Sequence, residues 1–267
     1  MILLDSRNYD FPQKSGKLHS VHSAEILPVF TRAWERCISP AITQAGSASQ
    51  VVTISLRAHE EQPEHGVDVT SESIDALMTA ATQVITHAFI AAQTGRLLML
   101  HAGAVAHPVT NRALVYVAAG GTGKTTFTRL LGTHYRYLTD ETVAVDEQHR
   151  VLPYPKPLSI RVPGSRYKAE TPPDDLGILP ANGPAPVVKI LLLDRSDSYQ
   201  TEPEVEAADL FDALIALAPQ TSALSKLDAG LHQLAGLIGT TGGVLRVQYR
   251  EAESLLPLVA DLIGDPE

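Results

Sequence analysis

The chain is poor in cysteine and in aromatic side chains. Its 267 residues contain one cysteine and one tryptophan, and phenylalanine, tryptophan and tyrosine together make up 5%. The single cysteine, Cys37, cannot form a disulfide within the chain, so a scaffold held by internal disulfides is excluded. We expect a reducing compartment, and we expect Cys37 to be a small, half-buried apolar side chain.

Positive charge is also scarce. Lysine and arginine number 21 against 30 aspartates and glutamates, which gives a formal net charge of −9. An acidic chain repels the phosphate backbone of nucleic acids and the anionic surface of membranes. We therefore expect no nucleic-acid partner and no membrane partner.

Long apolar runs are absent as well. Near the N-terminus Asp5 comes before any apolar run, so no secretory signal is predicted. The longest candidate span, residues 74–93, contains Asp75, Gln83 and His87, and we expect it to be too polar to cross a bilayer. These features predict a soluble, cytoplasmic protein.

Hydrophobic residues make up 44% of the chain, enough for one substantial core with a smaller lobe attached. Residues 1–70 are predicted to form that lobe, a small N-terminal α+β unit. Strands are expected over 18–29 and 50–56, with a helix over 30–37 between them. Residues 71–267 are predicted to form the main domain.

The main domain shows both helical and strand patterns. Apolar residues recur at helical spacing over 73–94, and Gly95 supplies the C-terminal stop. Buried strands are expected over 96–106, 112–117 and 187–194, a short strand over 135–139, and a hairpin between 142–145 and 151–152. Further helices are expected over 207–217, 224–238 and 254–263, with a strand over 245–249.

A proline-rich stretch interrupts this domain. Residues 153–186 hold nine of the 18 prolines, and such a stretch cannot be interior sheet or helix. We expect a long excursion over the surface, which is either a lid or a passive loop.

The most specific motif lies at residues 118–126, which read AAGGTGKTT. An apolar strand before it and a helix start after it provide the context of a phosphate-binding P-loop. Backbone N–H groups and the helix N-terminus can bind phosphate oxygens there. Lys124 is expected to neutralise the β- and γ-phosphates and Thr125 to ligate Mg²⁺. The predicted phosphate cradle consists of Gly120, Gly121, Thr122, Gly123, Lys124, Thr125 and Thr126.

A P-loop enzyme needs a carboxylate near its metal ion, and the sequence offers two candidates. Asp140 and Glu141 follow a predicted strand only 15 residues after Thr125, and such a pair can hold Mg²⁺ and accept a proton from a hydroxyl. Asp194 ends an apolar run 69 residues after Thr125, as the carboxylate of an ordinary P-loop NTPase does. Both assignments stay open at this level.

Residues 97–161 resemble the HPr kinase/phosphorylase family and its HPr-kinase-related relatives. The resemblance rests on the sequence HAGA at 101–104, the glycine-rich motif, the sequence YLTDE at 137–141 and the proline-rich segment that ends at Arg161. It implies an α/β (mixed α+β) fold with the compact P-loop core that this family shares with phosphoenolpyruvate carboxykinase.

The resemblance also implies roles for individual residues. Lys124, Asp140, Glu141, His101 and Arg161 would be catalytic, with Thr125 and Asp140 on the metal ion and ATP and Mg²⁺ as cofactors. Two positions depart from the HPr enzymes: Ser159 stands where those carry a glutamate close to the metal, and the second acid is Glu141 instead of aspartate. Both departures match the related kinases better, so HPr itself is not implied as the substrate.

The leading hypothesis is a kinase that phosphorylates a serine of a small protein or peptide, such as a ribosomal precursor peptide. Alternatives are a kinase for a sugar or another small alcohol, an ATP-binding sensor that transfers no phosphate, and an NTPase that uses Asp194. The resemblance further suggests a homo-oligomer, and residues 1–70 are a candidate for recognising the acceptor.

Overall fold

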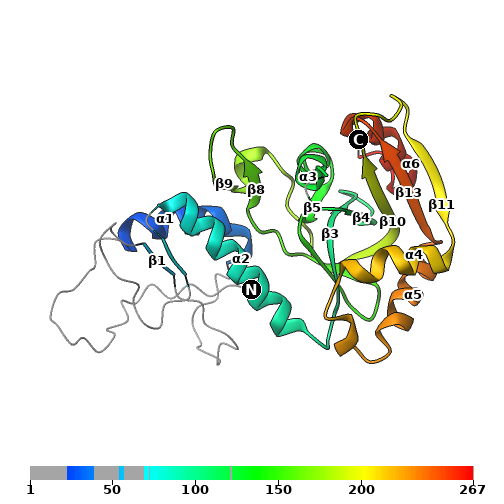
Figure 1. Cartoon of the computed structure of the whole chain (residues 1–267), viewed down its shortest axis with the longest axis horizontal. Coiled ribbons are helices and arrows are strands. Elements are labelled where there is room, and N and C mark those ends of the chain that lie inside the picture. Colours follow the sequence, from blue (N-terminus) through cyan, green and yellow to red (C-terminus); the bar gives the residue numbers. More distant parts are fainter. Residues whose placement is uncertain (1–22, 39–53, 57–68, 72, 121, 267) are drawn as a thin grey trace. The chain divides into compact units, whose positions relative to one another are not determined.

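The chain forms two compact units in a computed structural model (Figure 1). The first comprises residues 1–92 and 156–172, and the second comprises residues 93–155 and 173–267. The first unit therefore extends beyond the predicted lobe of residues 1–70. Both helices and strands are present, as expected of a mixed α/β protein. The structure describes residues 23–38, 54–56, 69–71, 73–120 and 122–266.

The first unit combines helices with two short strand pairs. Strand β1 pairs in parallel with β2, and β8 pairs antiparallel with β9. Thr79 Oγ1 of helix α2 donates a hydrogen bond to the Lys168 carbonyl at 3.1 Å, which ties α2 to β9. The elements are α1 (Ser23–Trp34), the 3-10 helix η1 (Glu35–Cys37), β1 (Ile54–Leu56), β2 (Val69–Ser71), α2 (Ile74–Gln93), β8 (Leu158–Arg161) and β9 (Lys168–Thr171).

Helix α1 corrects one sequence prediction. Residues 23–29, expected as part of a strand, are helical, whereas 18–22 lie outside the described residues. The buried side chains of α1 recur at helical spacing, and the rings of Phe30 and Trp34 stack with centroids 5.8 Å apart. The expected helix over 30–37 is confirmed as the end of α1 followed by η1. Burial raises the pKa of the Cys37 thiol to about 12, so this half-buried residue stays a neutral thiol.

Helix α2 confirms the helix expected over 73–94. Among the described residues it is the one helix whose length and composition would allow it to cross a membrane, with a mean hydropathy of 1.3. By length and hydropathy, therefore, the expectation that residues 74–93 are too polar to cross a bilayer is not met. Core helices of soluble proteins satisfy the same criterion when they are mostly buried, whereas 28% of this window of α2 is buried, including Leu77, Met78 and Ala81.

The proline-rich stretch is divided between the two units. Residues 156–172 contain the β8–β9 hairpin and belong to the first unit, so this part is not a plain loop. Residues 173–186 belong to the second unit and begin with the 3-10 helix η2 (Pro173–Leu176). No helix of more than one turn and no strand of the large sheet lies between residues 153 and 184, because proline removes backbone donors.

The second unit is built on a nine-stranded mixed sheet. Its order is β11-β13-β10-β4-β3-β6-β7, and β5 and β12 also pair with β3. Strand β10 runs parallel to β4 and β13, whereas the other pairings are antiparallel. The strands are β3 (Leu98–Ala106), β4 (Ala113–Ala118), β5 (Arg136–Thr139), β6 (Thr142–Val145), β7 (Arg150–Leu152), β10 (Ala185–Arg195), β11 (Glu204–Ala208), β12 (Thr221–Ser222) and β13 (Val244–Tyr249).

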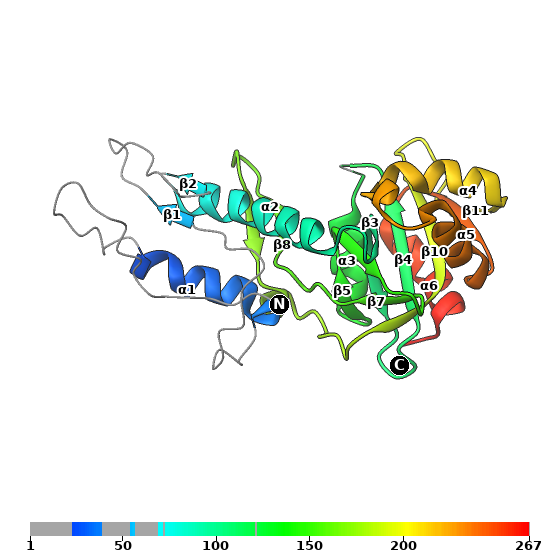
Figure 2. The ribbon, with the colours of Figure 1, turned by 90° about the horizontal axis from the view of Figure 1, so that it is seen from below.

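Helices cover both faces of this sheet (Figure 2). Apolar residues of α3 and α6 pack on one face, and those of α4 and α5 pack on the other. Strand β4 contributes side chains to the hydrophobic core on each face of the sheet, because successive side chains of a strand point to opposite faces. The helices are α3 (Lys124–Gly132), α4 (Leu210–Leu217), α5 (Gly230–Thr240) and α6 (Leu256–Ile263), with the 3-10 helices η3 (Ala218–Gln220), η4 (Leu224–Lys226) and η5 (Ala252–Leu255).

Two sequence predictions in this unit need correction. Residues 207–208, expected in a helix, end the edge strand β11, and helix α4 begins only at Leu210. The side chains of β11 are mostly exposed on both faces, so the strand lacks the alternation that would mark it. The helix expected over 224–238 consists of η4 followed by α5.

Gly103 of β3 is required by packing against β4. It pairs with Tyr116, and a Cβ at this position would meet the ring of that fully buried tyrosine. We predict that Gly103→Ala lowers the free energy of unfolding by about 1–3 kcal/mol, the usual effect of overpacking a core.

Chemical denaturation of Gly103→Ala measures this effect. Gly239→Ala is the matched control, because Gly239 is an exposed helical glycine with no atom within 4 Å of its Cβ position. In a double-mutant cycle, Gly103→Ala should cost less in a Tyr116→Leu background than in wild type, because the ring that the new Cβ meets is absent there. An unchanged free energy of unfolding in Gly103→Ala would contradict the packing argument.

Candidate active site

The glycine-rich motif forms the turn between β4 and α3, as the sequence predicts. Gly123 precedes the helix with φ of 99°, a left-handed conformation that favours glycine. Its carbonyl accepts the first helical hydrogen bond, from Phe127 N at 2.9 Å. Gly120 is exposed, and a Cβ there would meet nothing within 4 Å. Neither packing nor a positive φ requires glycine at position 120.

Two hydroxyls anchor the start of α3 to the sheet. Thr128 Oγ1 donates to the Lys124 carbonyl at 2.9 Å, and it lies 2.6 Å from the hydroxyl of Tyr116 on β4. Both side chains are fully buried, and burial raises the pKa of Tyr116. The helix N-terminus is therefore held in a fixed position relative to strand β4.

Lys124 points back toward the strand. Its Nζ donates to the Ala118 carbonyl at 2.6 Å and reaches the Ala119 carbonyl at 3.5 Å. Burial lowers its pKa, and the negative charges of Asp140 and Glu141 oppose that shift. Lys124 therefore lies within electrostatic range of the acidic pair.

Asp140 follows β5 and is 5% exposed. Its Oδ2 accepts a hydrogen bond from Thr125 Oγ1 at 3.2 Å, and its Oδ1 accepts one from the Tyr137 hydroxyl at 3.1 Å. The structure thus brings together the two residues predicted to hold the metal ion. Hydroxyl and carboxylate oxygens are the ligands that Mg²⁺ prefers, so these residues fit that ion.

Mg²⁺ commonly binds to one or two carboxylates together with phosphate oxygens. Within the described residues, no group of three or more His, Cys, Asp and Glu side chains could hold a metal ion. The candidate is therefore this single hydroxyl–carboxylate pair.

Glu141 and His101 meet within strand β3, where its antiparallel partner changes from β6 to β5. The Glu141 carbonyl accepts hydrogen bonds from Ala102 N at 3.2 Å and from His101 Nδ1 at 3.1 Å. A carbonyl can only accept, so Nδ1 carries the proton and Nε2 is the basic nitrogen of the neutral ring. The ring is partly exposed, and its burial, followed by the charge of Lys124, lowers its pKa. His101 therefore belongs to the same electrostatic cluster as Lys124 and the acidic pair.

Asp194, the alternative carboxylate, lies on the other face of the sheet. Leu191 and Leu193 of β10 pack in the core beneath α3. Because successive side chains of a strand point to opposite faces, Leu192 and Asp194 face the side of α4 and α5. Asp194 is exposed and accepts a hydrogen bond from the Tyr199 hydroxyl at 2.5 Å. The geometry around the glycine-rich turn therefore favours Asp140 as the carboxylate of the site.

The remaining predicted residues lie elsewhere or outside the described part. Arg161 is exposed at the end of β8 in the first unit, whereas the other described site residues belong to the second unit. Ser159 on the same strand donates to both carboxylate oxygens of Glu170 at 2.9 Å. Thr122 and Thr126 lie on the turn and the first turn of α3, with Thr126 exposed. Gly121 lies outside the described residues.

Sequence reasoning missed two side chains near the site. Tyr137 holds Asp140 in place, and its position three residues earlier in the same short strand is the signal that could have shown it. Arg195 lies beside Gly123, with its Cδ 4.0 Å from the Cβ position of that glycine. No local pattern links Arg195 to a residue 72 positions earlier.

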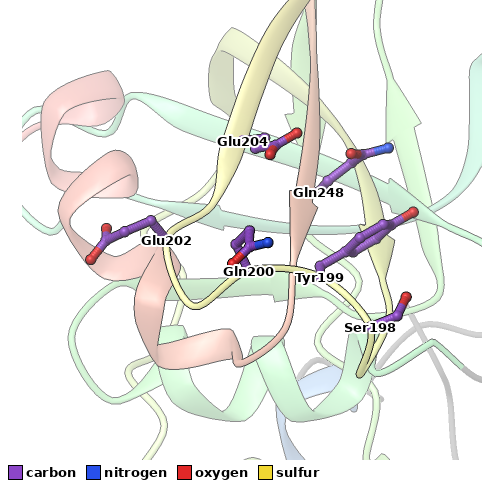
Figure 3. A pocket seen from close by; sticks show the side chains of 6 residues that line it. All are labelled: Ser198, Tyr199, Gln200, Glu202, Glu204 and Gln248. Atoms are coloured by element: carbon purple, nitrogen blue, oxygen red, sulfur yellow. The ribbon is translucent and has the colours of Figure 1, made fainter.

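A small hollow lies beyond the carboxyl end of β10 (Figure 3). Gln248, one of its lining residues, alternates with the buried Val247 and Tyr249, which face α3. Because two lining side chains are carboxylates and none is a cation, the hollow does not suit a polyphosphate. It is lined by Ser198, Tyr199, Gln200, Glu202, Glu204 and Gln248.

Comparison with known proteins includes a distant structural match. No family model and no curated protein matches this chain. Among solved structures, the HPr(Ser) kinase/phosphatase from Coxiella burnetii matches 62% of this chain and 93% of its own length. The sequence identity is 11% and the TM-score is 0.32. A likeness this distant carries no functional argument, so the chain's own residues carry the assignment below.

The charges around His101 can be tested by titration. We predict that its pKa lies below the ordinary value of 6.5 and rises in Lys124→Met, because that change removes a cation that disfavours protonation. Glu141→Gln should shift the pKa in the opposite direction, because it removes an anion that favours protonation. The NMR shift of the imidazole Cε1 proton against pH measures both effects.

Lys226→Met serves as the control for that titration, because Lys226 is not among the groups that shift the His101 pKa. A His101 pKa that is the same in wild type, Lys124→Met and Glu141→Gln would show that these charges do not share one cluster.

Proposed function

We propose that this protein is an ATP- and Mg²⁺-dependent kinase that transfers a γ-phosphate to a hydroxyl. The observation that carries the proposal is the hydrogen bond from Thr125 to the buried Asp140. It joins the hydroxyl of a GKT sequence to a carboxylate directly after β5, and that carboxylate acts electrostatically on Lys124. A serine of a small protein or peptide is the proposed acceptor, supported by the resemblance of residues 97–161 to HPr-kinase-related enzymes.

The first task of the site is to bind the polyphosphate. Backbone N–H groups of the glycine-rich turn and the N-terminus of α3 attract phosphate oxygens. Lys124, which donates to the Ala118 carbonyl at 2.6 Å, would exchange that hydrogen bond for one to a phosphate. A bound Mg²⁺ supplies charge neutralisation on the β- and γ-phosphates. Thr125 and Asp140 would hold it.

The second task is to orient and deprotonate the acceptor hydroxyl. Both oxygens of Asp140 accept hydrogen bonds from Thr125 and Tyr137, and the residue is buried. Glu141 is more accessible and lies next in the chain. We therefore assign metal binding to Asp140 and proton acceptance from the hydroxyl to Glu141.

Phosphate transfer from γ-labelled ATP with Mg²⁺ to serine-containing peptides tests this function. Lys124→Ala and Asp140→Asn are predicted to lower the transfer rate at least about a hundredfold, because each removes charge stabilisation of the transferring group. Asp194→Asn is the matched control, an aspartate on the other face of the sheet, and it should stay within about threefold of wild type.

Three other outcomes would point to other functions. Loss of activity in Asp194→Asn with Asp140→Asn unaffected would indicate an NTPase that uses Asp194. Transfer to a sugar or alcohol but not to peptides would indicate a small-molecule kinase. ATP binding without transfer to any acceptor would indicate a sensor, and thermal unfolding of each variant verifies that the fold is kept.

A further inference from the structure

Arg195 reaches the glycine-rich turn from the strand next to β4. Leu193 of β10 is paired in parallel register with Ala118, the last residue of β4. The carboxyl ends of both strands therefore meet at one edge of the sheet, where open α/β sheets bind their ligands. Arg195 follows two residues after Leu193 and lies at this edge.

The side chain of Arg195 lies on the same face of the sheet as α3. Leu191 and Leu193 pack with Phe127 of α3, and alternation places Arg195 on their side. The Cδ atom is 4.0 Å from the Cβ position of Gly123, the residue that caps α3. Its aliphatic part thus runs alongside the start of the helix that the proposed function assigns to phosphate.

Two contacts hold the guanidinium. Nε donates to the Arg250 carbonyl at 3.0 Å, and Nη2 donates to Asp197 Oδ1 at 2.8 Å. The Arg195 side chain is 39% exposed and that of Asp197 is 81% exposed. The carbonyl fixes the position of the guanidinium, whereas an exposed ion pair contributes little and is readily exchanged. A phosphate oxygen can therefore take the place of the Asp197 carboxylate.

A further cation at this edge would offset the negative charge of the site. Asp140 and Glu141 bring two carboxylates to the region where a polyphosphate would bind, and the nearby Lys124 is 9% exposed. Arginine suits phosphate because its planar fork can donate two parallel hydrogen bonds. On the basis of the function proposed above, we infer that Arg195 binds a phosphate of the nucleotide. In the absence of nucleotide, the Asp197 carboxylate pairs with the guanidinium in its place.

The dissociation constant for Mg-ATP, measured by titration calorimetry, tests this inference. Arg195→Gln should weaken binding about ten- to a hundredfold, as expected for loss of hydrogen bonds to a charged group. Its binding should also depend less on salt concentration than that of wild type. The dissociation constant of Arg195→Lys should lie between those of wild type and Arg195→Gln, because lysine keeps the charge but lacks the planar fork of arginine.

Asp197→Asn removes the competing carboxylate and should tighten Mg-ATP binding about two- to fivefold. Arg246→Gln is the matched control, an arginine of similar exposure (45%) that pairs with Asp212 and alternates with Val247, away from α3. Its dissociation constant should equal that of wild type.

The outcomes separate the two proposals. If Lys124→Ala abolishes binding while Arg195→Gln binds like Arg246→Gln, the inference about Arg195 is wrong and the kinase proposal stands. If wild type binds no Mg-ATP, both are wrong. If thermal unfolding shows that Arg195→Gln is not folded, the inference is tested with Arg195→Lys and Asp197→Asn instead. An unchanged affinity for Mg-ATP in both of these variants would overturn it.

Discussion

The burial of strand β4 on both faces is the constraint on which the second unit depends. All six of its residues are buried, in alternation beneath α3 and α6 on one side and beneath α4 and α5 on the other. Because both faces of β4 are covered, charged side chains are excluded from it. The polar residues of the candidate site therefore begin directly after the strand ends. The contact between Tyr116 and Thr128 then fixes the direction in which α3 leaves the turn. The proposed phosphate chemistry at this turn would thus rest on a rigid apolar support.

The candidate site is a balance of opposite charges around one turn. Lys124 and Arg195 supply positive charge from α3 and β10, and Asp140 and Glu141 supply negative charge from the end of β5. Lys124, Arg195 and Asp140 each have neutral partners: the carbonyls of Ala118 and Arg250 accept from the two cations, and Thr125 and Tyr137 donate to Asp140. Such neutral contacts position charged groups without cancelling them, which is the arrangement that charge stabilisation in phosphoryl transfer requires.

Local sequence patterns predicted much of the fold. They failed for elements in which buried and exposed residues do not follow a clear periodicity. Helix α2, strand β4 and the β6–β7 hairpin were predicted because periodicity and apolar content agreed with the structure. Strand β11 was missed because an edge strand exposed on both faces has no alternation to detect. Residues 23–29 were predicted as a strand because their helical periodicity becomes clear only when the burial of Phe30, Ala33 and Trp34 is included.

The sequence by itself determined the glycine-rich turn between strand and helix, the lysine and threonine that follow it, and the short distance to an acidic pair. These features are local, because a left-handed Gly123 and an apolar strand are encoded by neighbouring residues. Only the tertiary structure placed Asp140 in hydrogen-bond contact with Thr125, Asp194 in contact with Tyr199, and Arg195 beside Gly123. The physical reason is the pleat of β10, whose alternation sends Asp194 and Arg195 to opposite faces once the strand pairs with β4.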